Sequence, residues 1–261
     1  MRRVKISVDS GAYPQELQSL FDGATIYDSS SSPEARVIYI EKDGGYYLKS
    51  AAGGALLNEA KMTAYFHEKG LSTEVLSYVF GERDYLLTRR VVGEDATNKE
   101  YLSDPKRLCD LMAESLRRLH ETDFSDCPID IRNETYLETI KENYSRGIYD
   151  PAFMQERFRG FDRDRAYDFV MNNRTALSGR VLLHGDYCLP NIMLDNWRLS
   201  AFIDLGNAGV GDRHIDLFWG AWTLNFNLGT DEYRARFFDA YGRDLVDLDK
   251  IDYVSLAESF G

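Results

Sequence analysis

The sequence has few of the residues from which disulfide frameworks, redox motifs and zinc sites are built. Only three of its 261 residues are cysteines, Cys109, Cys127 and Cys188, and no two of them form a C-x-x-C pair. An odd number of widely spaced cysteines is typical of free thiols. We therefore exclude a disulfide-stabilised secreted fold, and we interpret Cys188 as a bystander thiol in the motif that surrounds it.

Long hydrophobic runs are also missing. Charged residues or glycines interrupt every apolar stretch before it reaches the roughly 18 to 20 residues that a membrane-spanning helix needs. Residues 1–5 have the basic character of a signal-peptide start, but Asp9 and Gly11 come before any apolar segment of about seven residues. We therefore expect a cytoplasmic protein with no membrane partner.

Acidic residues outnumber basic residues by 43 to 31, which gives a formal net charge of -12. Residues 1–93 contain 12 acidic and 11 basic residues, net -1, so the remaining 31 acidic and 20 basic residues give net -11. A negative surface repels phosphate backbones, and we expect no nucleic-acid partner. A small cationic substrate would fit the charge of the second part, although an acidic surface also keeps proteins soluble.

Up to about residue 92 the sequence is rich in predicted strands. Two β-favouring runs are separated by the turn residues 42–45, which predicts a hairpin. A helical pattern follows and ends at Gly70. The expected elements are strands at 36–40 and 46–49, a helix at 55–68, and strands at 74–80 and 85–87.

Helical patterns dominate the rest of the chain. Asp104 is the expected N-cap of a helix that has Pro105 at its first position. The apolar residues that follow recur every three or four positions, which gives the helix one face to bury. The exception to the helical pattern is the region 180–204, where three short β-favouring runs alternate with turns, at 181–183, 192–194 and 201–203.

The strongest chemical signal lies in this exceptional region. Residues 184–191 read H-G-D-Y-C-L-P-N, and Asp204-Leu205-Gly206 follows thirteen residues after Asn191. Phosphoryl transfer needs a carboxylate that orients the attacking hydroxyl and oxygen ligands that hold Mg²⁺ on the nucleotide phosphates. Asp186, Asn191 and Asp204 supply these groups. The apolar runs between them predict a hairpin that returns Asp204 to the side of Asn191, while His184 is interpreted as a structural histidine bonded to nearby backbone.

These motifs resemble those of the aminoglycoside O-phosphotransferases, relatives of the choline kinases and, more distantly, of the protein kinases. The resemblance rests on H-G-D-x-x-x-x-N at 184–191, on Ile203 to Gly206 and on G-D-R-H-I-D-L at 211–217. The resemblance also includes Leu119-His120-Glu121. Within the family the chain is most similar to the 3'-phosphotransferases, whose chains likewise end in a helix that has an acidic and an aromatic residue near its end.

The resemblance implies an α+β fold of the bilobal protein-kinase type. Residues 1–92 would form a nucleotide-binding lobe, an antiparallel sheet with one main helix, and residues 93–261 a mostly helical catalytic and acceptor-binding lobe. It also implies that Asp186 is the catalytic base, that Asn191 and Asp204 bind Mg²⁺, and that ATP or GTP is the phosphoryl donor. The sequence makes no prediction of oligomeric state.

A kinase-like first lobe needs a strand lysine that meets the α- and β-phosphates and a helix glutamate that holds this lysine. Lys49 and Glu59 fit these positions, and their spacing permits an ion pair. Tyr47 shares a strand face with Lys49, because side chains alternate along a strand, and resembles the aromatic on which adenine stacks. The further nucleotide-contact positions that the resemblance implies are Ser32 in the serine loop 29–32, and Arg89 and Val91 in the hinge.

The acceptor expected from the resemblance is an aminoglycoside, phosphorylated at its 3' hydroxyl with antibiotic resistance as the outcome. The expected acceptor-site residues are Glu258 and Phe260, followed by Asp150 and Glu156 in an expected helical insertion. The sequence departs from the family pattern at two places. It has Asn207 where many members have an arginine, and it has Phe226 and Asn227 where related enzymes have acidic residues. Fewer carboxylates should weaken or narrow antibiotic binding.

Other functions remain open on the sequence alone. A kinase of another small hydroxyl compound, such as choline, homoserine or a sugar, would share the same phosphate machinery. A protein kinase or P-loop enzyme is disfavoured because the chain has neither a glycine-rich loop nor a G-x-x-x-x-G-K-[ST] motif. A pseudokinase would lack one of Lys49, Asp186, Asn191 or Asp204, and a metal-dependent hydrolase would need a second histidine at ligand spacing.

Overall fold

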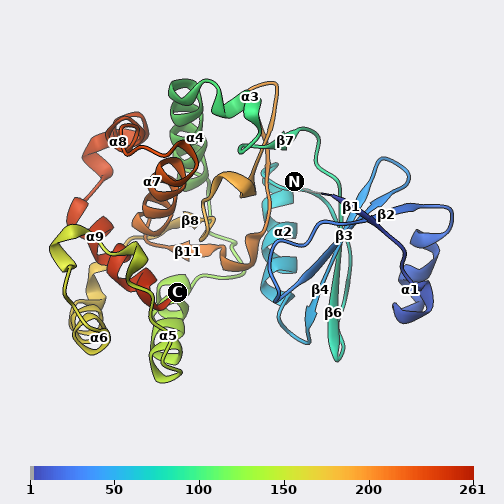
Figure 1. Ribbon diagram of the computed structural model, residues 1–261, viewed down its shortest axis with the longest axis horizontal. Helices are drawn as coiled ribbons and strands as arrows, with labels where there is room; N and C mark the ends of the chain where they lie inside the picture. The colour runs from blue at the N-terminus through green and yellow to red at the C-terminus, as the bar shows by residue number, and fades with distance from the viewer. Residues whose placement is uncertain (1–2) are drawn as a thin grey trace. The chain divides into compact units, whose positions relative to one another are not determined.

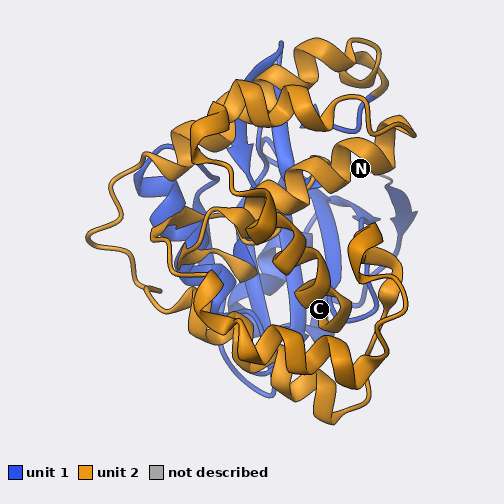
Figure 2. Ribbon diagram, turned by 90° about the vertical axis from the view of Figure 1, so that its left-hand side faces the viewer, with its two compact units in different colours: residues 1–98, 190–206 blue, residues 99–189, 207–261 orange. Residues whose placement is uncertain are grey.

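A computed structural model describes residues 3–261, and within them the chain forms two compact units (Figure 2). Unit 1 contains the residues up to 98 together with the segment 190–206. Unit 2 contains residues 99–189 and 207–261. The short segment 190–206 therefore returns to unit 1 after the chain has built most of unit 2.

Unit 1 is built on a six-stranded sheet in which every neighbouring pair of strands is antiparallel, in the order β1-β2-β3-β4-β6-β5. A second sheet has the order β10-β9-β7. The bounds are β1 Val4–Ile6, α1 Gln15–Gln18, β2 Thr25–Asp28, β3 Arg36–Glu41, β4 Tyr46–Ala52, α2 Leu57–Glu68, β5 Val75–Val79, β6 Arg83–Arg89, β7 Glu94–Asp95, β9 Ile192–Asp195 and β10 Arg198–Phe202.

Helices α2 and α1 lie on opposite sides of the six-stranded sheet (Figure 1). Each face of the sheet buries its own apolar cluster. Leu48 of β4 packs with Leu17 of α1 on one face. Ala51, three residues further along β4, packs with Ala60 of α2 on the other. Because strand side chains alternate between faces, the odd-numbered side chains of β4 point toward the α2 face. The expected hairpin 36–40 with 46–49, the helix and the two later strands are confirmed within a few residues.

The segment 190–206 is a tight hairpin of β9 and β10. Its two turn residues, Asn196 and Trp197, have φ values of 49° and 61°, as a two-residue type I′ turn requires. At the open end of the hairpin the backbone N–H of Ile203 donates to the carbonyl of Asn191 at 3.0 Å. The predicted return of the chain to the side of Asn191 is therefore confirmed.

Unit 2 is mostly helical, with one two-stranded antiparallel sheet of β8 and β11. Four apolar residues of α4, Leu108, Met112, Leu116 and Leu119, are at most 1% exposed, as their periodicity predicts. Leu111, which the same pattern includes, is only partly buried. The bounds are α3 Lys99–Leu102, α4 Pro105–His120, α5 Arg132–Ser145, α6 Arg163–Asn172, β8 Val181–Leu183, β11 Gly209–Gly211, α7 His214–Leu228, α8 Arg234–Gly242 and α9 Leu248–Ala257.

Two further features of the described residues are the form of the segment around 150–156 and the character of the helices. The insertion expected to be helical around residues 150–156 contains only short 3-10 turns, at Pro151–Phe153 and Glu156–Phe158. Among residues 3–261, no helix combines the length and the apolar character that crossing a bilayer requires.

The Asp104 cap of α4 gives a stability prediction. Its carboxylate accepts the backbone N–H of Arg107 at 3.2 Å, which satisfies one of the free donors at the start of the helix. Asp104→Ala should lower the free energy of unfolding by about 1 kcal/mol in urea denaturation. Asp104→Asn retains an acceptor and should stay near the parent. Equal losses in the two variants would contradict the capping role.

Candidate active site

Unit 1 contains a pocket of about 380 Å³ whose lining residues all belong to that unit. Lys49 of β4 lies on its wall and is held by two carboxylates. Its Nζ is 2.7 Å from Oε2 of Glu59 on α2 and 2.7 Å from Oδ1 of Asp204. Burial on its own lowers the pKa of Lys49, but the two carboxylates reverse this and raise the pKa above its ordinary value. The ammonium group therefore stays charged.

Asp204 is placed by an unusual backbone conformation. Its φ is 60°, in the left-handed region that residues other than glycine seldom occupy. Such conformations concentrate at functional sites, where the surrounding structure imposes them. About half of the Asp204 side chain remains exposed, so its carboxylate can accept a further partner beside Lys49. Asn191, at the other end of the hairpin, lines the same pocket.

The remaining predicted nucleotide residues differ in position. Tyr47, Arg89 and Val91 line the pocket. The serine loop also reaches it, through Ser29, Ser30 and Ser31, whereas Ser32 is exposed and is not part of the lining. The apolar part of the wall comes from Val37, Leu86, Met193 and Ile203.

Arg3 also lines the pocket, although no sequence pattern pointed to it. Its guanidinium lies 3.8 Å from the ring centroid of Tyr39 and donates to the hydroxyl of Tyr47 at 2.7 Å. No motif contains this arginine. Its position depends on the pairing of β1 with β2, and a strand of only three residues gave little signal.

Asp186 lies in unit 2, in the loop that follows β8. Asp216 of α7 fixes the start of this loop, because its carboxylate accepts the backbone N–H groups of His184 at 2.8 Å and Gly185 at 2.7 Å. Gly185 has a φ of 83°, and a Cβ there would come within 2.0 Å of the carbonyl oxygen of Asn207. His184 is fully buried, and its Nδ1 accepts the backbone N–H of Asp186 at 3.3 Å. The structural interpretation of His184 is thus confirmed.

The Asp186 loop is also fixed at the residues that follow Asp186. The backbone N–H of Leu189 donates to the hydroxyl of Thr223 on α7 at 3.1 Å, and the hydroxyl of Tyr187 donates to the carbonyl of Met112 on α4 at 2.8 Å. Burial raises the pKa of Cys188, and the neighbouring Asp186 carboxylate raises it further. A thiol of this kind stays protonated, as expected of a bystander.

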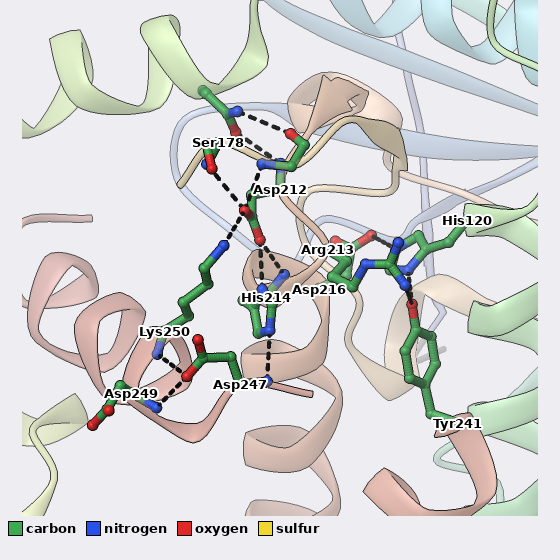
Figure 3. Close-up of polar contacts among 12 residues, drawn as sticks. His120, Ser178, Asp212, Arg213, His214, Asp216, Tyr241, Asp247, Asp249 and Lys250 are labelled. Carbon is green, nitrogen blue, oxygen red and sulfur yellow. Dashed lines mark hydrogen bonds and ion pairs between the residues drawn. The ribbon is translucent and has the colours of Figure 1, made fainter. Parts of the chain in front are cut away.

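Asp216 is itself part of a buried network (Figure 3). Nε2 of His120 lies 3.1 Å from its Oδ2, and Nδ1 of the same ring lies 2.8 Å from the hydroxyl of Tyr241. Because a carboxylate can only accept, Nε2 has the proton and Nδ1 accepts from the tyrosine. Complete burial lowers the pKa of His120, although Asp216 opposes this shift, and keeps the ring neutral.

A second network in Figure 3 fixes the segment that precedes α7. Asp212 accepts the ring Nδ1 of His214 at 2.6 Å and the backbone N–H of Gly179 at 2.7 Å, and Nζ of Lys250 is 3.2 Å away. Burial raises the pKa of Asp212, but the hydrogen bonds from His214 and Gly179 outweigh it and hold the pKa well below its usual range. The G-D-R-H-I-D-L motif thus holds the Asp186 loop through Asp216 and the segment before β8 through Asp212.

The four predicted acceptor residues are not alike in exposure. Asp150 and Glu156 are exposed; the former caps a 3-10 turn and the latter pairs with Arg159. Glu258 and Phe260 are buried, and the ring of Phe260 packs 5.4 Å from that of Tyr149. The structure gives Glu258 and Phe260 a packing function, and the acceptor role of all four residues stays a prediction.

The model of the family described as "Phosphotransferase enzyme family" matches residues 30–254. This match covers most of the sequence. The chain belongs to the phosphotransferase enzyme family. The resemblance that the motifs indicated is confirmed.

Individual relatives agree with this assignment. A probable aminoglycoside 3'-phosphotransferase of Lactococcus lactis is 50% identical over 262 residues, covering 100% of this chain and 99% of the relative. An aminoglycoside 3'-phosphotransferase of Niallia circulans is 34% identical over 69% of this chain and 68% of its own. The crystal structure of a type VIII aminoglycoside 3'-phosphotransferase superimposes with a TM-score of 0.79, at 24% identity over 96% of both chains.

A phosphotransferase from Streptomyces rimosus, in complex with ADP and streptomycin, gives a TM-score of 0.73 at 24% identity, over 86% of this chain and 90% of its own. At this identity the structural likeness establishes the fold. The predicted α+β, kinase-like fold class is confirmed, with the antiparallel sheets and the many helices in place.

Glu258 gives a pH-dependent prediction. Burial raises its pKa to about 7, while hydrogen bonds from Tyr136 and Trp219 oppose the shift. Because the folded pKa exceeds the ordinary value of 4.5, the folded protein binds this proton more tightly than the unfolded chain between about pH 4.5 and 7. The carboxyl group therefore costs stability progressively as the pH rises through this window, in total about 3 kcal/mol.

Glu258→Gln removes this titration. At pH 8 the variant should be more stable than the parent, and the difference should shrink as the pH falls toward 5. Unfolding by urea at several pH values measures both curves. A difference that does not change with pH would contradict the assignment.

Proposed function

We propose that this protein transfers the γ-phosphoryl group of ATP to the 3' hydroxyl of an aminoglycoside and so confers antibiotic resistance. The observation that supports this most directly is the pair of ion pairs formed by Lys49. Its ammonium group lies between the carboxylates of Glu59 and Asp204 on the wall of a pocket of about 380 Å³. The names of the Lactococcus and Niallia relatives, one of them half identical over the full chain, support the choice of acceptor.

The pocket of unit 1 has the groups that a nucleoside triphosphate requires. The ring of Tyr47 and the apolar wall formed by Leu86 and Met193 offer surfaces for the base. Lys49 would neutralise the phosphates, and the backbone near Arg89 and Val91 would contact the edge of the base. Ser29, Ser30 and Ser31 bring hydroxyl groups to the same space. GTP presents the same phosphates, and a donor panel distinguishes the two nucleotides.

Asn191 and Asp204 are suited to hold Mg²⁺ on the phosphates. They provide one amide and one carboxylate oxygen at the pocket, and the Asp204 side chain is half exposed. Mg²⁺ is commonly held by one or two protein oxygens, with phosphates and water completing six ligands, so the donor set fits. The bound ion would neutralise charge that develops on the transferred phosphoryl group.

The role of the protein in the chemical step is positioning. Asp186 would accept a hydrogen bond from the acceptor hydroxyl and take its proton as the oxygen attacks the γ-phosphorus. The bond between this phosphorus and the β–γ bridging oxygen breaks, and ADP is the leaving group. Asp216 accepts hydrogen bonds from the backbone before Asp186, and Thr223 accepts one from the backbone after it. These bonds keep the Asp186 loop in one conformation.

The functional division that we propose is a nucleotide-binding lobe of residues 1–92 and a catalytic and acceptor-binding lobe of residues 93–261. Segment 190–206, which packs in unit 1, would provide the metal ligands to the nucleotide. The acidic surface of the second lobe would attract the ammonium groups of the acceptor. ATP is a cytoplasmic metabolite, and we place the reaction in the cytoplasm.

Two variants test the proposal. Asp186→Ala should lower kcat at least 100-fold, because the hydroxyl loses its acceptor, while ATP still binds in isothermal titration calorimetry. Lys49→Ala should weaken ATP binding itself. Mass spectrometry of kanamycin after incubation with enzyme, Mg²⁺ and ATP measures transfer. Asp168→Asn, which changes an exposed carboxylate on α6, should behave as the parent.

Full activity of the Asp186 variant would refute the assigned role. If the parent phosphorylates choline, homoserine or a simple sugar in a coupled ADP-release assay and leaves kanamycin unmodified, the acceptor is a metabolite and the resistance function is wrong.

A further inference from the structure

A row of three tyrosines crosses the six-stranded sheet of unit 1 and ends at the pocket. Tyr39 on β3 is the direct cross-strand partner of Tyr27 on β2 and of Tyr47 on β4. The ring centroids are 6.0 Å apart in the first pair and 5.1 Å apart in the second. Aromatic residues that lie opposite one another on neighbouring strands stabilise each other. These three residues are called the tyrosine ladder, and Tyr47 is its end at the pocket.

Tyr39, the middle ring of the tyrosine ladder, is fixed by its surroundings. It is only 4% exposed. A Cβ at Gly45 would come within 2.7 Å of the Tyr39 hydroxyl oxygen, so a side chain at that position would displace the ring. Gly45 has a φ of 101°, which glycine adopts without strain. The turn before β4 therefore leaves room for Tyr39, and the ring is a firm support for its neighbour Tyr47.

Arg3 contacts two rings of the tyrosine ladder at once. Its guanidinium lies 3.8 Å from the centroid of Tyr39 and donates to the hydroxyl of Tyr47 at 2.7 Å. An exposed arginine has many rotamers, and restricting it to one of them is unfavourable in entropy. A cation–π contact and a hydrogen bond from a charged donor, made together, offset that loss. The two contacts thus hold an exposed side chain in one place.

The same contacts leave part of Tyr47 open to the pocket. The guanidinium carbon of Arg3 is 5.8 Å from the centroid of Tyr47, against 3.8 Å for Tyr39. Arg3 therefore stacks on Tyr39 and meets Tyr47 at its hydroxyl end. Tyr47 still lines the pocket together with Thr88, its cross-strand partner on β6. Its ring is thus held at the hydroxyl and supported by a neighbouring ring, with surface left for a ligand.

We propose that Arg3 is a positioning residue for the nucleotide, which holds the ring of Tyr47 in the orientation in which the base stacks on it. This rests on the proposed phosphotransferase function and deepens it. A ring that is free to turn must be ordered when a base binds, and that ordering weakens binding. A ring that is already held binds the base without this loss. Arg3 acts through Tyr47, while the phosphates are left to Lys49.

The stacking itself limits the size of the effect. A stacking contact between a base and one aromatic ring changes affinity by about two- to tenfold. A residue that acts only through the ring contributes no more than this. An arginine that bound the triphosphate directly would instead strengthen the binding of ATP and leave that of adenosine unchanged, because adenosine has no phosphate to accept its hydrogen bonds.

Isothermal titration calorimetry with MgATP, and with adenosine in competition against MgATP, tests this role. Arg3→Ala should raise the Kd of both ligands about fivefold, because both stack on the same ring. Lys5→Ala is the matched control. It removes an exposed positive charge from β1, next to Arg3 in the chain but outside the pocket lining, and should keep the parent Kd values. A loss seen with ATP and not with adenosine would mean that Arg3 contacts the phosphates, and would overturn the proposal.

A double-mutant cycle tests whether the effect passes through Tyr47. Tyr47→Phe retains the ring and removes the hydroxyl that Arg3 bonds. In the Tyr47→Phe background, Arg3→Ala should raise the Kd of ATP by less than about twofold, because the bond is already lost. Losses that multiply in the double variant would show that the two residues act independently, which contradicts the proposal.

Steady-state kinetics separate positioning of the nucleotide from the chemical step. Arg3→Ala should raise the KM for ATP about fivefold, with kcat and the KM for kanamycin within about twofold of the parent, because a stacked base binds alike in the ground state and the transition state. A fall in kcat with an unchanged KM for ATP would contradict the assigned role.

Failure of this proposal and failure of the proposed function give different results. If the parent phosphorylates kanamycin and Arg3→Ala keeps the parent Kd for ATP, the positioning role is wrong and the proposed function stands. If Arg3→Ala weakens ATP binding but the parent transfers nothing to kanamycin, the positioning role stands and the proposed acceptor is wrong. If Arg3→Ala lowers only the Tm, the arginine stabilises the sheet and the positioning role is wrong. A parent that binds no ATP contradicts both proposals.

Discussion

The ammonium group of Lys49, held at 2.7 Å by Glu59 and at 2.7 Å by Asp204, is the interaction on which the candidate nucleotide site depends. One positive charge between two carboxylates leaves a local excess of negative charge, which is unfavourable in a partly buried place. A bound cation shared with Asp204 would relieve it. The arrangement therefore suits a site where a metal-bound triphosphate completes the charge balance, since Asp204 is also the residue with strained backbone and an exposed side chain.

Much of this site could be predicted because its residues lie in local patterns with a chemical reason. The hairpin that joins Asn191 to Asp204 has clear β-favouring runs and a two-residue turn, so its closure followed from the sequence. Lys49 and Glu59 were expected from the family resemblance, and local patterns predicted the strand and the helix that carry them. The N-cap of α4 and its buried face were likewise determined by neighbouring residues, within the reach of one helix.

What the sequence did not reveal depends on contacts between distant segments. Arg3 reaches Tyr47 because β1 pairs at the edge of the sheet, and no local pattern predicts which ring an arginine will meet. The burial of Glu258 and Phe260 depends on Tyr136 and Tyr149, which lie more than 100 residues earlier. No local pattern near Glu258 and Phe260 predicts that these residues pack into unit 2.

The proposed reaction requires recognition of phosphate and recognition of the acceptor. These two tasks differ in how many kinds of side chain can perform them. Phosphate recognition requires charge at fixed points, so a lysine, two carboxylates and an amide are needed wherever the reaction is the same. Acceptor recognition can be achieved either by carboxylates or by ring faces, because an amino sugar presents both ammonium groups and an apolar face. Thr223 of α7 accepts the backbone N–H of Leu189 and so keeps the Asp186 loop in place whichever groups contact the acceptor. The same helix holds the start of the Asp186 loop through Asp216 and its later part through Thr223, so the conformation of this loop is set by the packing of unit 2 itself.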